Sequence, residues 1–318
     1  GRGKLRCAAM ILEALTPIFA IILLGFLISR TPISSQEVWQ GLERLTYYLF
    51  FPALLVSRLS QTNFEVNELL EIGYVLGFAL FVFTILFIGL RKFIARNQGS
   101  LSSVYQGSIR FNTYIGLACV EALYGDNGLT LAALCLVVYI PLVNVLSVIS
   151  ISASGGGNRW VVVTGSVLTN PLVLACLIGM GLSFYNMEVP DLGWEIIEVL
   201  SRPALPLGLL AVGAGIHFVA FGDQTWQLVV ALFCKLLAFP ALVVVATLLF
   251  KMAPGLSAVL LLLTCLPAPP SAYILARQLG GNVSLMANII TLQTLFAFFT
   301  IPLWVDIGDR FLWLNLIL

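Results

Sequence analysis

The feature that most constrains this chain is a series of ten apolar runs, each about 18 to 25 residues long and poor in charge. Apolar residues make up 60% of the chain and charged residues only 10%, against roughly 25% charged in ordinary soluble domains. Because water cannot solvate a fold with so much apolar side chain, the sequence predicts an all-α polytopic membrane protein with ten transmembrane helices. The runs cover residues 11–29, 38–59, 69–90, 101–124, 128–152, 160–184, 196–218, 226–250, 255–279 and 285–305.

Charge and cysteine content exclude several classes of protein. The formal net charge is +1 and the basic residues are scattered, so no nucleic-acid partner is expected. Five of the six cysteines fall within the apolar runs, and no CxxC or Cys/His pattern exists, so no metal or other cofactor is expected. No nucleophile, base and orienting group occur at a recognisable spacing, so the chain is not expected to be an enzyme.

An internal repeat divides the chain into two copies. Because each copy holds five spans, an odd number, the second copy must enter the membrane in the opposite orientation. The sequence therefore predicts two inverted five-helix repeats, residues 11–151 and 160–318, joined by a cytoplasmic linker at residues 152–159. The matching pairs are Thr16, Pro17 and Gly25 with Asn170, Pro171 and Gly179, Pro52 with Pro206, YGDNG at 124–128 with LGGNV at 279–283, and IPL at 140–142 with IPL at 301–303.

The distribution of basic residues in short loops predicts the orientation. The linker side carries Arg30, Arg91, Lys92, Arg96 and Arg159, and the opposite side carries Arg58, Arg202, Lys251 and Arg310 together with several acids. This bias puts both termini in the extracellular or periplasmic space of a plasma (inner) membrane protein. The N-terminal tail, residues 1–10, argues the other way through Arg2, Lys4 and Arg6, and whether it is native stays open because Gly1 is not a start methionine.

Three prolines lie within four positions in the middle of the ninth run, in LPAPPSAYILARQ at 266–278. A proline inside a helix removes a hydrogen bond and clashes with the preceding turn, and in hydrocarbon the freed groups must find partners or line a wet cavity. Pro267, Pro269 and Pro270 therefore predict a helix broken into two halves, the second starting near Ser271. Unpaired amides at that start would form a positive dipole end suited to an anion.

The counterpart in the first repeat, SIRFNTYIGLACVEALYG at 108–125, contains no proline. Asn112 and Thr113 can instead satisfy unwound backbone through their side chains. If the repeats are pseudo-symmetric, the breaks in spans four and nine cross near the bilayer midplane, where two helix amino ends converge on one polar site. Whether the proline-free span is broken to the same degree stays open.

Residues at the two breaks are the expected substrate-binding residues. Asn112 and Thr113 either bind substrate or fasten helices, and their position at the break favours binding. An arginine in mid-span is costly and faces a cavity or a partner, so Arg110 is expected to meet a substrate anion or to pair with Glu121 or another side chain. The expected binding set is Arg110, Asn112, Thr113, Tyr114, Ser271 and Tyr273, with Pro267, Pro269 and Pro270 as the scaffold of the break.

Other polar residues within the spans are candidates for ion binding or structural support. Amide side chains either offer oxygens to a cation or fasten helices, which is the commoner use. Lys235 lies about ten residues into its run, where it meets an acidic partner or the anion path. No carboxylate suited to a proton relay stands out, so sodium and proton coupling both stay open. These candidates are Gln278, Asn144, Gln293, Lys235 and Glu121.

Several motifs resemble those of the auxin efflux carrier family, which includes plant PIN carriers and bacterial carboxylate carriers. They are Thr16 and Pro17 with Gly25, FPALL at 51–55, FNT at 111–113 followed by ALYGDNG, Asn170 and Pro171 with LIG at 177–179, ALPL at 204–207 with AVGAG, and LPAPPSAYILARQLGG. The resemblance implies a ten-helix, two-repeat fold similar to that of bile acid sodium symporters, with crossing broken helices four and nine and extracellular termini. It also implies secondary transport of organic anions.

Two departures limit what carries over from the resemblance. Plant PIN carriers have a long regulatory loop between the repeats and often a proline before the asparagine of helix four. This chain has a linker of eight residues and Phe111 at that place, so neither phosphorylation control nor auxin as substrate is carried over.

The expected function is a secondary transporter that moves a small organic anion, a carboxylate or an auxin-like weak acid, by alternating access. Helices one, two, six and seven would move against the crossing core. The alternative is a non-transporting membrane sensor that binds a lipid or metabolite in the same cavity. The expected partners are the organic anion and the lipid bilayer, and a homodimer is left open.

Overall fold

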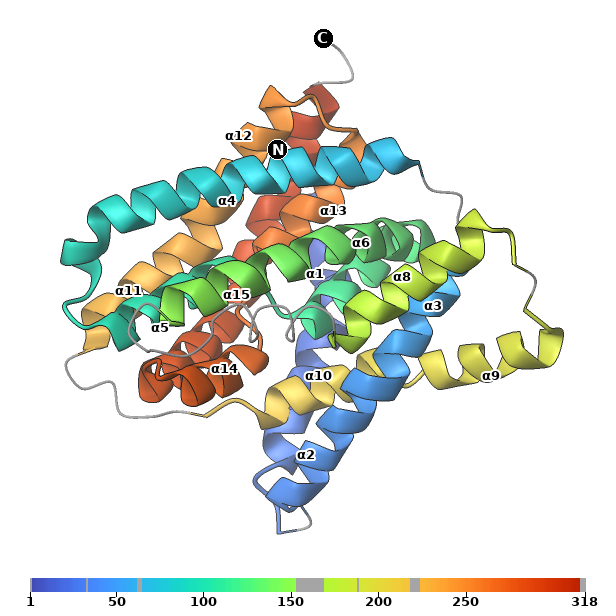
Figure 1. Ribbon diagram of the computed structural model, residues 1–318, viewed down its shortest axis with the longest axis horizontal. Helices are drawn as coiled ribbons and strands as arrows, with labels where there is room; N and C mark the ends of the chain where they lie inside the picture. Colours follow the sequence, from blue (N-terminus) through green and yellow to red (C-terminus); the bar gives the residue numbers. More distant parts are fainter. Residues whose placement is uncertain are drawn as a thin grey trace.

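The computed structural model describes residues 2–32, 34–61, 65–152, 169–187, 189–217 and 224–314, and all regular secondary structure in these ranges is helical (Figure 1). Within these ranges, six helical stretches are long and apolar enough to cross a membrane and two further apolar helices are shorter, so the chain is an integral membrane protein. The elements are α1 (Arg2–Ile28), α2 (Gln36–Leu45), η1 (Thr46–Phe50), α3 (Phe51–Ser60), α4 (Val66–Ile94), α5 (Gln98–Ile109), α6 (Thr113–Ser152), α8 (Pro171–Phe184), α9 (Asp191–Ser201), α10 (Ala204–Ala214), α11 (Thr225–Phe233), η3 (Cys234–Ala238), α12 (Phe239–Leu249), α13 (Pro254–Thr264), α14 (Ser271–Leu279) and α15 (Val283–Leu314).

A π-helical turn precedes the motif Phe-Pro-Ala-Leu at two places in the chain. η1 leads into Phe51 and Pro52, and η3 leads into Phe239 and Pro240. The amide of each phenylalanine bonds to the carbonyl five residues earlier. Because a proline ring clashes with the carbonyl four residues before it, the wider turn relieves the clash and both helices continue through their proline.

Several of the expected spans are divided in ways that hydropathy alone does not reveal. Gly125 adopts φ 63°, which separates the spans 101–124 and 128–152 inside α6. Arg202 and Pro203 divide the span 196–218 into α9 and α10. The linker beyond Ser152 and the first part of the span 160–184 lie outside the described residues.

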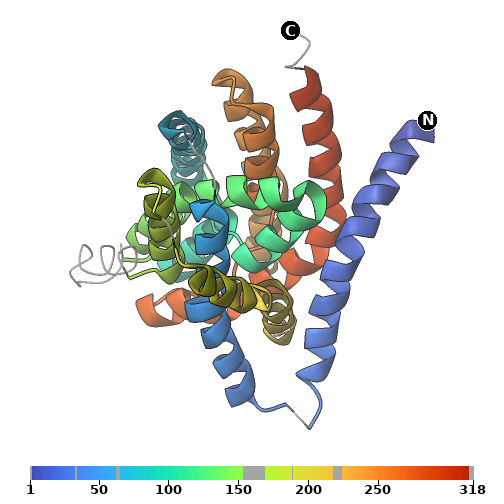
Figure 2. The ribbon, with the colours of Figure 1, turned by 90° about the vertical axis from the view of Figure 1, so that its right-hand side faces the viewer.

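Glycines bring two helix pairs into close contact. A Cβ at Gly25 of α1 would clash with the backbone of α10, and a Cβ at Gly213 of α10 would clash with the backbone of α1. Gly179 of α8 lies against α3 in the same manner, 2.8 Å from Leu59 Cβ when a Cβ is added. Small residues let membrane helices approach to backbone contact, which maximises their packing. α1 is therefore tightly joined to α10 and α8 to α3; Figure 2 shows α1 along the outer edge of the molecule.

Aromatic rings join α4, α5, α6 and α12 into a second group of helices. The ring centroid of Phe83 lies 6.3 Å from that of Tyr105 and 5.5 Å from that of Phe239, and Tyr139 lies 6.5 Å from Phe239. These rings enclose α5, whose last ten residues are all buried except Leu101, although four of them are serines. Protein rather than lipid therefore surrounds this polar helix, which leads directly into the candidate site.

Candidate functional site at two helix breaks

The first break separates α5 from α6 without any proline. α5 ends at Ile109, Arg110 is extended with φ −79° and ψ 154°, and α6 begins at Thr113. The Asn112 carboxamide oxygen Oδ1 accepts hydrogen bonds from the backbone amides of Tyr114 at 3.0 Å and Ile115 at 3.3 Å. An asparagine that caps a helix in this way competes with helix continuation, so Asn112 does here what prolines do between α13 and α14. The fourth span is therefore broken.

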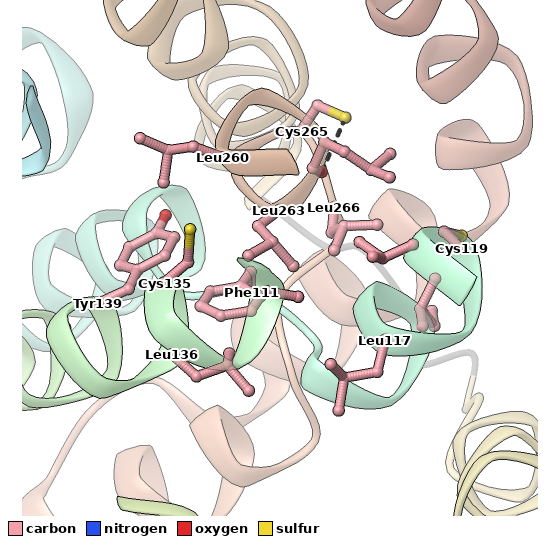
Figure 3. Close-up of a cluster of buried hydrophobic side chains, with 14 of the residues drawn as sticks. Phe111, Leu117, Cys119, Cys135, Leu136, Tyr139, Leu260, Leu263, Cys265 and Leu266 are labelled. Carbon is pink, nitrogen blue, oxygen red and sulfur yellow. Dashed lines mark hydrogen bonds between the residues drawn. The ribbon is translucent and has the colours of Figure 1, made fainter. Parts of the chain in front are cut away.

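The carboxyl end of α5 is satisfied by a side chain from farther along the chain. Tyr139 Oη donates to the carbonyl oxygen of Ile109 at 2.9 Å. The Phe111 ring stacks on the Tyr139 ring with centroids 4.5 Å apart and planes 22° apart. Figure 3 shows Phe111 between Tyr139 and Leu263, so the apolar side of the break is filled by side chains of α6 and α13. One tyrosine thus both pairs the freed carbonyl and seals the core beside it.

The second break separates α13, which ends at Thr264, from α14, which begins at Ser271. Pro267, Pro269 and Pro270 lie between them, as the sequence predicts. The freed amide of Ala268 donates to Gln293 Oε1 at 2.8 Å. Backbone amides of Ala272 and Tyr273 pair with the carbonyls of Pro269 and Pro270 at 2.9 and 3.0 Å, which starts α14.

Gln293 of α15 ties the two breaks to a third helix. Besides accepting from Ala268, its Nε2 donates to the carbonyls of Gly107 at 3.0 Å and Ala231 at 3.1 Å. The side chain is fully buried and its oxygen and both of its N–H donors are used. The sequence leaves two roles open for Gln293, cation binding and the fastening of helices. The geometry matches the fastening of helices.

The two breaks contact each other directly. The backbone amide of Asn112 donates to the carbonyl of Pro267 at 2.8 Å. The Arg110 guanidinium nitrogen Nη2 donates to Ser271 Oγ at 3.1 Å. Residues 161 positions apart are thus joined by a side-chain bond, and the amino ends of α6 and α14 meet beside it. Both amino ends carry positive partial charge.

Arg110 has no carboxylate partner in the part of the chain that the structure describes, where ion pairs within 4.0 Å join Arg58 to Asp126 and Arg202 to Glu198. The expectation that Glu121 pairs with Arg110 is wrong, because Glu121 is exposed and interacts electrostatically with Arg58 and Asp126 instead. A half-buried guanidinium without an anion is costly in a membrane core. The position is therefore suited to an anion supplied from outside the chain.

Asn112 also offers a donor that no acceptor uses. Its side chain is 1% exposed, and its Nδ2 has no hydrogen-bond partner among the described residues. A buried donor without an acceptor costs about 1 to 3 kcal/mol, so its presence calls for an explanation. Nδ2 of Asn112 and the guanidinium of Arg110 are both donors, and they flank the contact between the breaks. A carboxylate would satisfy both.

The other expected binding residues lie around this contact in different settings. Tyr114 is buried, and its ring stacks on Phe51 of α3 with centroids 4.6 Å apart and planes 9° apart. Tyr273 packs against the small apolar cluster formed by α14 and α15. Thr113 is half-buried at the start of α6. The contact between Tyr114 and Phe51 links the crossing to the helix pair α3 and α8.

The remaining support candidates are Lys235, Asn144 and Gln278. Lys235 is fully buried in η3, and among the described residues its Nζ has no hydrogen-bond partner; the Phe239 ring lies 5.5 Å away. The expected acidic partner of Lys235 is therefore absent from the ion pairs of the described chain. Asn144 is buried in α6. The side chain of Gln278 lies outside the described residues.

Two residues at the crossing were not predicted from the sequence. Tyr47, in the π-helical turn η1, interacts electrostatically with Arg110. Gln106 lies one helical turn before Arg110, is fully buried, and has neither its Oε1 nor its Nε2 paired within the described residues. The polar run QGSLSSVYQGS inside an apolar span was the available signal for Gln106. No local sequence pattern predicts that Tyr47 interacts with Arg110, because the position of Tyr47 depends on the π-helical turn before Pro52.

Comparisons with known proteins agree with a transport site. Residues 10–305 match the model of the family described as Membrane transport protein. A protein of Rhizobium meliloti (strain 1021) named "Putative malonate transporter" is 24% identical over 297 residues, which cover 90% of this chain and 92% of that protein. The family and this relative are described as transporters, and neither is described as an enzyme.

Proposed function

The chain belongs to the auxin efflux carrier family of membrane transport proteins, and from that premise we propose that it is a secondary transporter that moves a small organic anion by alternating access. The observation that carries this proposal is a pair of groups at the crossing: the guanidinium of Arg110, which bonds to Ser271 Oγ but has no carboxylate partner in the described chain, and Nδ2 of Asn112, which has no hydrogen-bond partner there. The protein is a transporter and not an enzyme.

Binding of a carboxylate at the crossing would use three groups from both breaks. Arg110 would donate through its guanidinium, Asn112 through Nδ2 and Ser271 through Oγ. The existing bond from Arg110 to Ser271 at 3.1 Å shows that the two side chains reach the same point. The amino ends of α6 and α14 add positive potential there, since backbone amides and the helix dipole favour anions. Charge-assisted hydrogen bonds of this kind are roughly twice as strong as neutral ones.

A two-repeat architecture explains why two differently built breaks meet. We propose ten helices in two inverted repeats, with broken helices four and nine crossing. The glycine contacts support it: Gly25 packs the first helix of repeat one on the second helix of repeat two, and its repeat partner Gly179 packs the first helix of repeat two on the second helix of repeat one. Such an exchange is what a twofold pseudo-axis in the membrane plane produces.

Alternating access would move the helices α1, α3, α8 and α10 against the crossing core. The backbone contacts at Gly25 and Gly179 make α1–α10 and α3–α8 stiff pairs, which suits rigid-body motion. The stack of Tyr114 on Phe51 lies between one such pair and the crossing, so it would break or slide during the motion. We place the linker side in the cytoplasm and the termini outside the plasma (inner) membrane, following the basic residues at the linker end of α1 and α4.

The substrate class that we propose is a small dicarboxylate such as malonate. The name of the Rhizobium relative supports it, and the lack of a carboxylate beside Arg110 among the described residues leaves that charge for a carboxylate of the substrate. A second carboxyl group would lie in the positive potential at the amino ends of α6 and α14. An auxin-like weak acid could bind the same donors through its single carboxylate, so such acids serve as comparison substrates for the dicarboxylate.

Uptake into proteoliposomes tests the proposed function. Purified protein should give saturable uptake of radiolabelled malonate above that of protein-free liposomes, and unlabelled dicarboxylates should compete better than acetate or indole-3-acetate. Failure to move or bind any acid of a broad panel would overturn the proposal. Binding of an acid without flux, detected as a thermal shift of the folded protein, would favour a sensor instead.

A further inference from the structure

An apolar groove runs along α1, where this helix faces α15. It encloses about 310 Å³, within the range of ligand pockets. The lining comes from Phe19, Ile22, Leu23 and Phe26 of α1 and from Leu295 and Phe298 of α15. The four α1 residues follow the spacing of one helix face, three or four residues apart.

The groove offers nothing to a carboxylate. Its polar wall residue, Thr294, is buried and donates its hydroxyl to the carbonyl of Ile290 at 2.8 Å. The other lining residues are apolar. Two of them are also largely exposed, Leu23 at 55% and Leu295 at 45%, so the groove opens on the surface that faces the bilayer. An acyl chain fits this chemistry, and the transported anion does not.

A cation closes one end of the groove. Arg30, one turn beyond Phe26, donates to the carbonyl of Phe26 at 3.1 Å and to that of Ile216 at 3.5 Å, and its guanidinium carbon lies 3.5 Å from the centroid of the Phe26 ring. Phe26 and Ile216 both line the groove. Arg30 is exposed and forms no ion pair within the described residues, and a guanidinium has five N–H donors, so most of them remain available.

The length of the groove matches one leaflet of a bilayer. Arg30 lies eleven positions after Phe19 and just beyond the end of α1 at Ile28, which corresponds to about 16 Å at the helical rise of 1.5 Å per residue. The hydrocarbon core of a bilayer is about 30 Å thick, so its half-thickness is about 15 Å. An acyl chain in the groove would therefore place its head group at the level of Arg30.

We propose that this groove binds an anionic phospholipid, with an acyl chain between α1 and α15 and the phosphate on Arg30. The site lies where α1, which is fixed to α10 at Gly25, meets α15 through the edge-to-face pair of Phe19 and Phe298 at 5.1 Å. The lipid thus binds at a seam between two helix groups. The binding assay below needs no transported substrate, so its outcome is independent of the proposed transport.

Native mass spectrometry of the full chain with dioleoyl phosphatidylglycerol or dioleoyl phosphatidylcholine tests the proposal. The wild type should retain phosphatidylglycerol in preference, and Arg30→Ala should reduce that preference about fivefold, the factor expected for one basic residue at a membrane surface. Arg91→Ala removes an exposed arginine near the end of α4 and should leave the preference unchanged. Equal preference in Arg30→Ala and wild type would overturn the head-group assignment.

A second pair of variants tests the acyl chain. Leu295→Trp fills the groove and should lower retention of both lipids, whereas Phe299→Trp, on the same helix and 70% exposed outside the groove, should not. Unchanged retention in Leu295→Trp would overturn the proposal. The proposal would also be overturned if Leu295→Trp abolished a dimer and did not lower lipid retention, because a second copy of the chain would then cover the groove.

Discussion

The two helix breaks meet at one point but are built by opposite means. The break at residues 265–270 is enforced by three prolines, and its freed amide at Ala268 is paired by Gln293. The break at residues 110–112 has no proline and depends on Asn112, whose oxygen caps α6 and whose nitrogen stays unpaired. The freed groups of the proline break are thus paired by other parts of the chain, whereas the asparagine break leaves the Nδ2 donor for a ligand. In the proposed site, shape comes mainly from the proline break and binding chemistry mainly from the asparagine break.

The largest expected effect comes from Asn112→Asp, which separates capping from binding. An aspartate oxygen still caps α6 and suits its dipole, so the protein should fold. The change removes the Nδ2 donor and adds a negative charge beside the substrate carboxylate, so malonate uptake should fall at least about 100-fold, which corresponds to roughly 2.7 kcal/mol. Uptake in proteoliposomes and thermal unfolding are the two measurements.

Asn170 provides the matched control for this prediction. Its Oδ1 caps α8 by accepting from the amides of Leu172 at 3.0 Å and Val173 at 3.3 Å, the same distances as at Asn112. Asn112→Ala and Asn170→Ala should each cost about 1 kcal/mol of stability, but only the former should lose uptake. Equal loss of uptake in both would make Asn112 a cap and nothing more.

Replacing the charge at the crossing is expected to have the next largest effect. Arg110→Gln should raise the concentration of malonate that half-saturates uptake by about 10- to 100-fold, because hydrogen bonds to charged groups contribute roughly 1.5 to 3 kcal/mol. Arg110→Lys keeps the charge but loses the planar pair of donors, so it should lie between wild type and Arg110→Gln. If the malonate concentration that half-saturates uptake were unchanged in Arg110→Gln, Arg110 would be excluded from the site.

A smaller effect is expected on stability when the brace between the breaks is removed. Gln293→Leu keeps the side-chain volume near its original value but removes the hydrogen bonds to the amide of Ala268 and to the carbonyls of Gly107 and Ala231. Interhelical hydrogen bonds in membranes contribute about 0.6 kcal/mol on average, so the loss of three should cost roughly 2 kcal/mol. Thermal unfolding should show this loss of stability in Gln293→Leu. Gln36→Ala, a change at an exposed glutamine, should leave the unfolding temperature unchanged.

The smallest effect is expected from a single proline of the redundant break. Pro269→Ala leaves Pro267 and Pro270 in place, and Ala268 still pairs with Gln293, so α13 and α14 should stay separate. Unfolding temperature and malonate uptake should both stay close to those of the wild type. A large loss of uptake would show that the proline break is not redundant and that its exact shape sets the site.

Much of this arrangement could be predicted from the sequence, because proline and hydropathy act locally. Pro267, Pro269 and Pro270 predict the break between α13 and α14. The internal repeat of the sequence indicates Asn112 as the counterpart of this break. The degree of the first break could not be predicted, since it depends on the distant Tyr139 that pairs with Ile109. The partners of Arg110 could not be predicted either, because tertiary packing brings Ser271 to Arg110 and a π-helical turn positions Tyr47.

A structure of the protein with the acid that shows saturable uptake is the most direct test of the central claim. The claim predicts a carboxylate between the breaks, with an oxygen about 2.7 to 2.9 Å from the Arg110 guanidinium and another within hydrogen-bond distance of Asn112 Nδ2 and Ser271 Oγ. The acid bound elsewhere in the molecule, with the bond from Arg110 to Ser271 intact and Asn112 Nδ2 still unpaired, would contradict it.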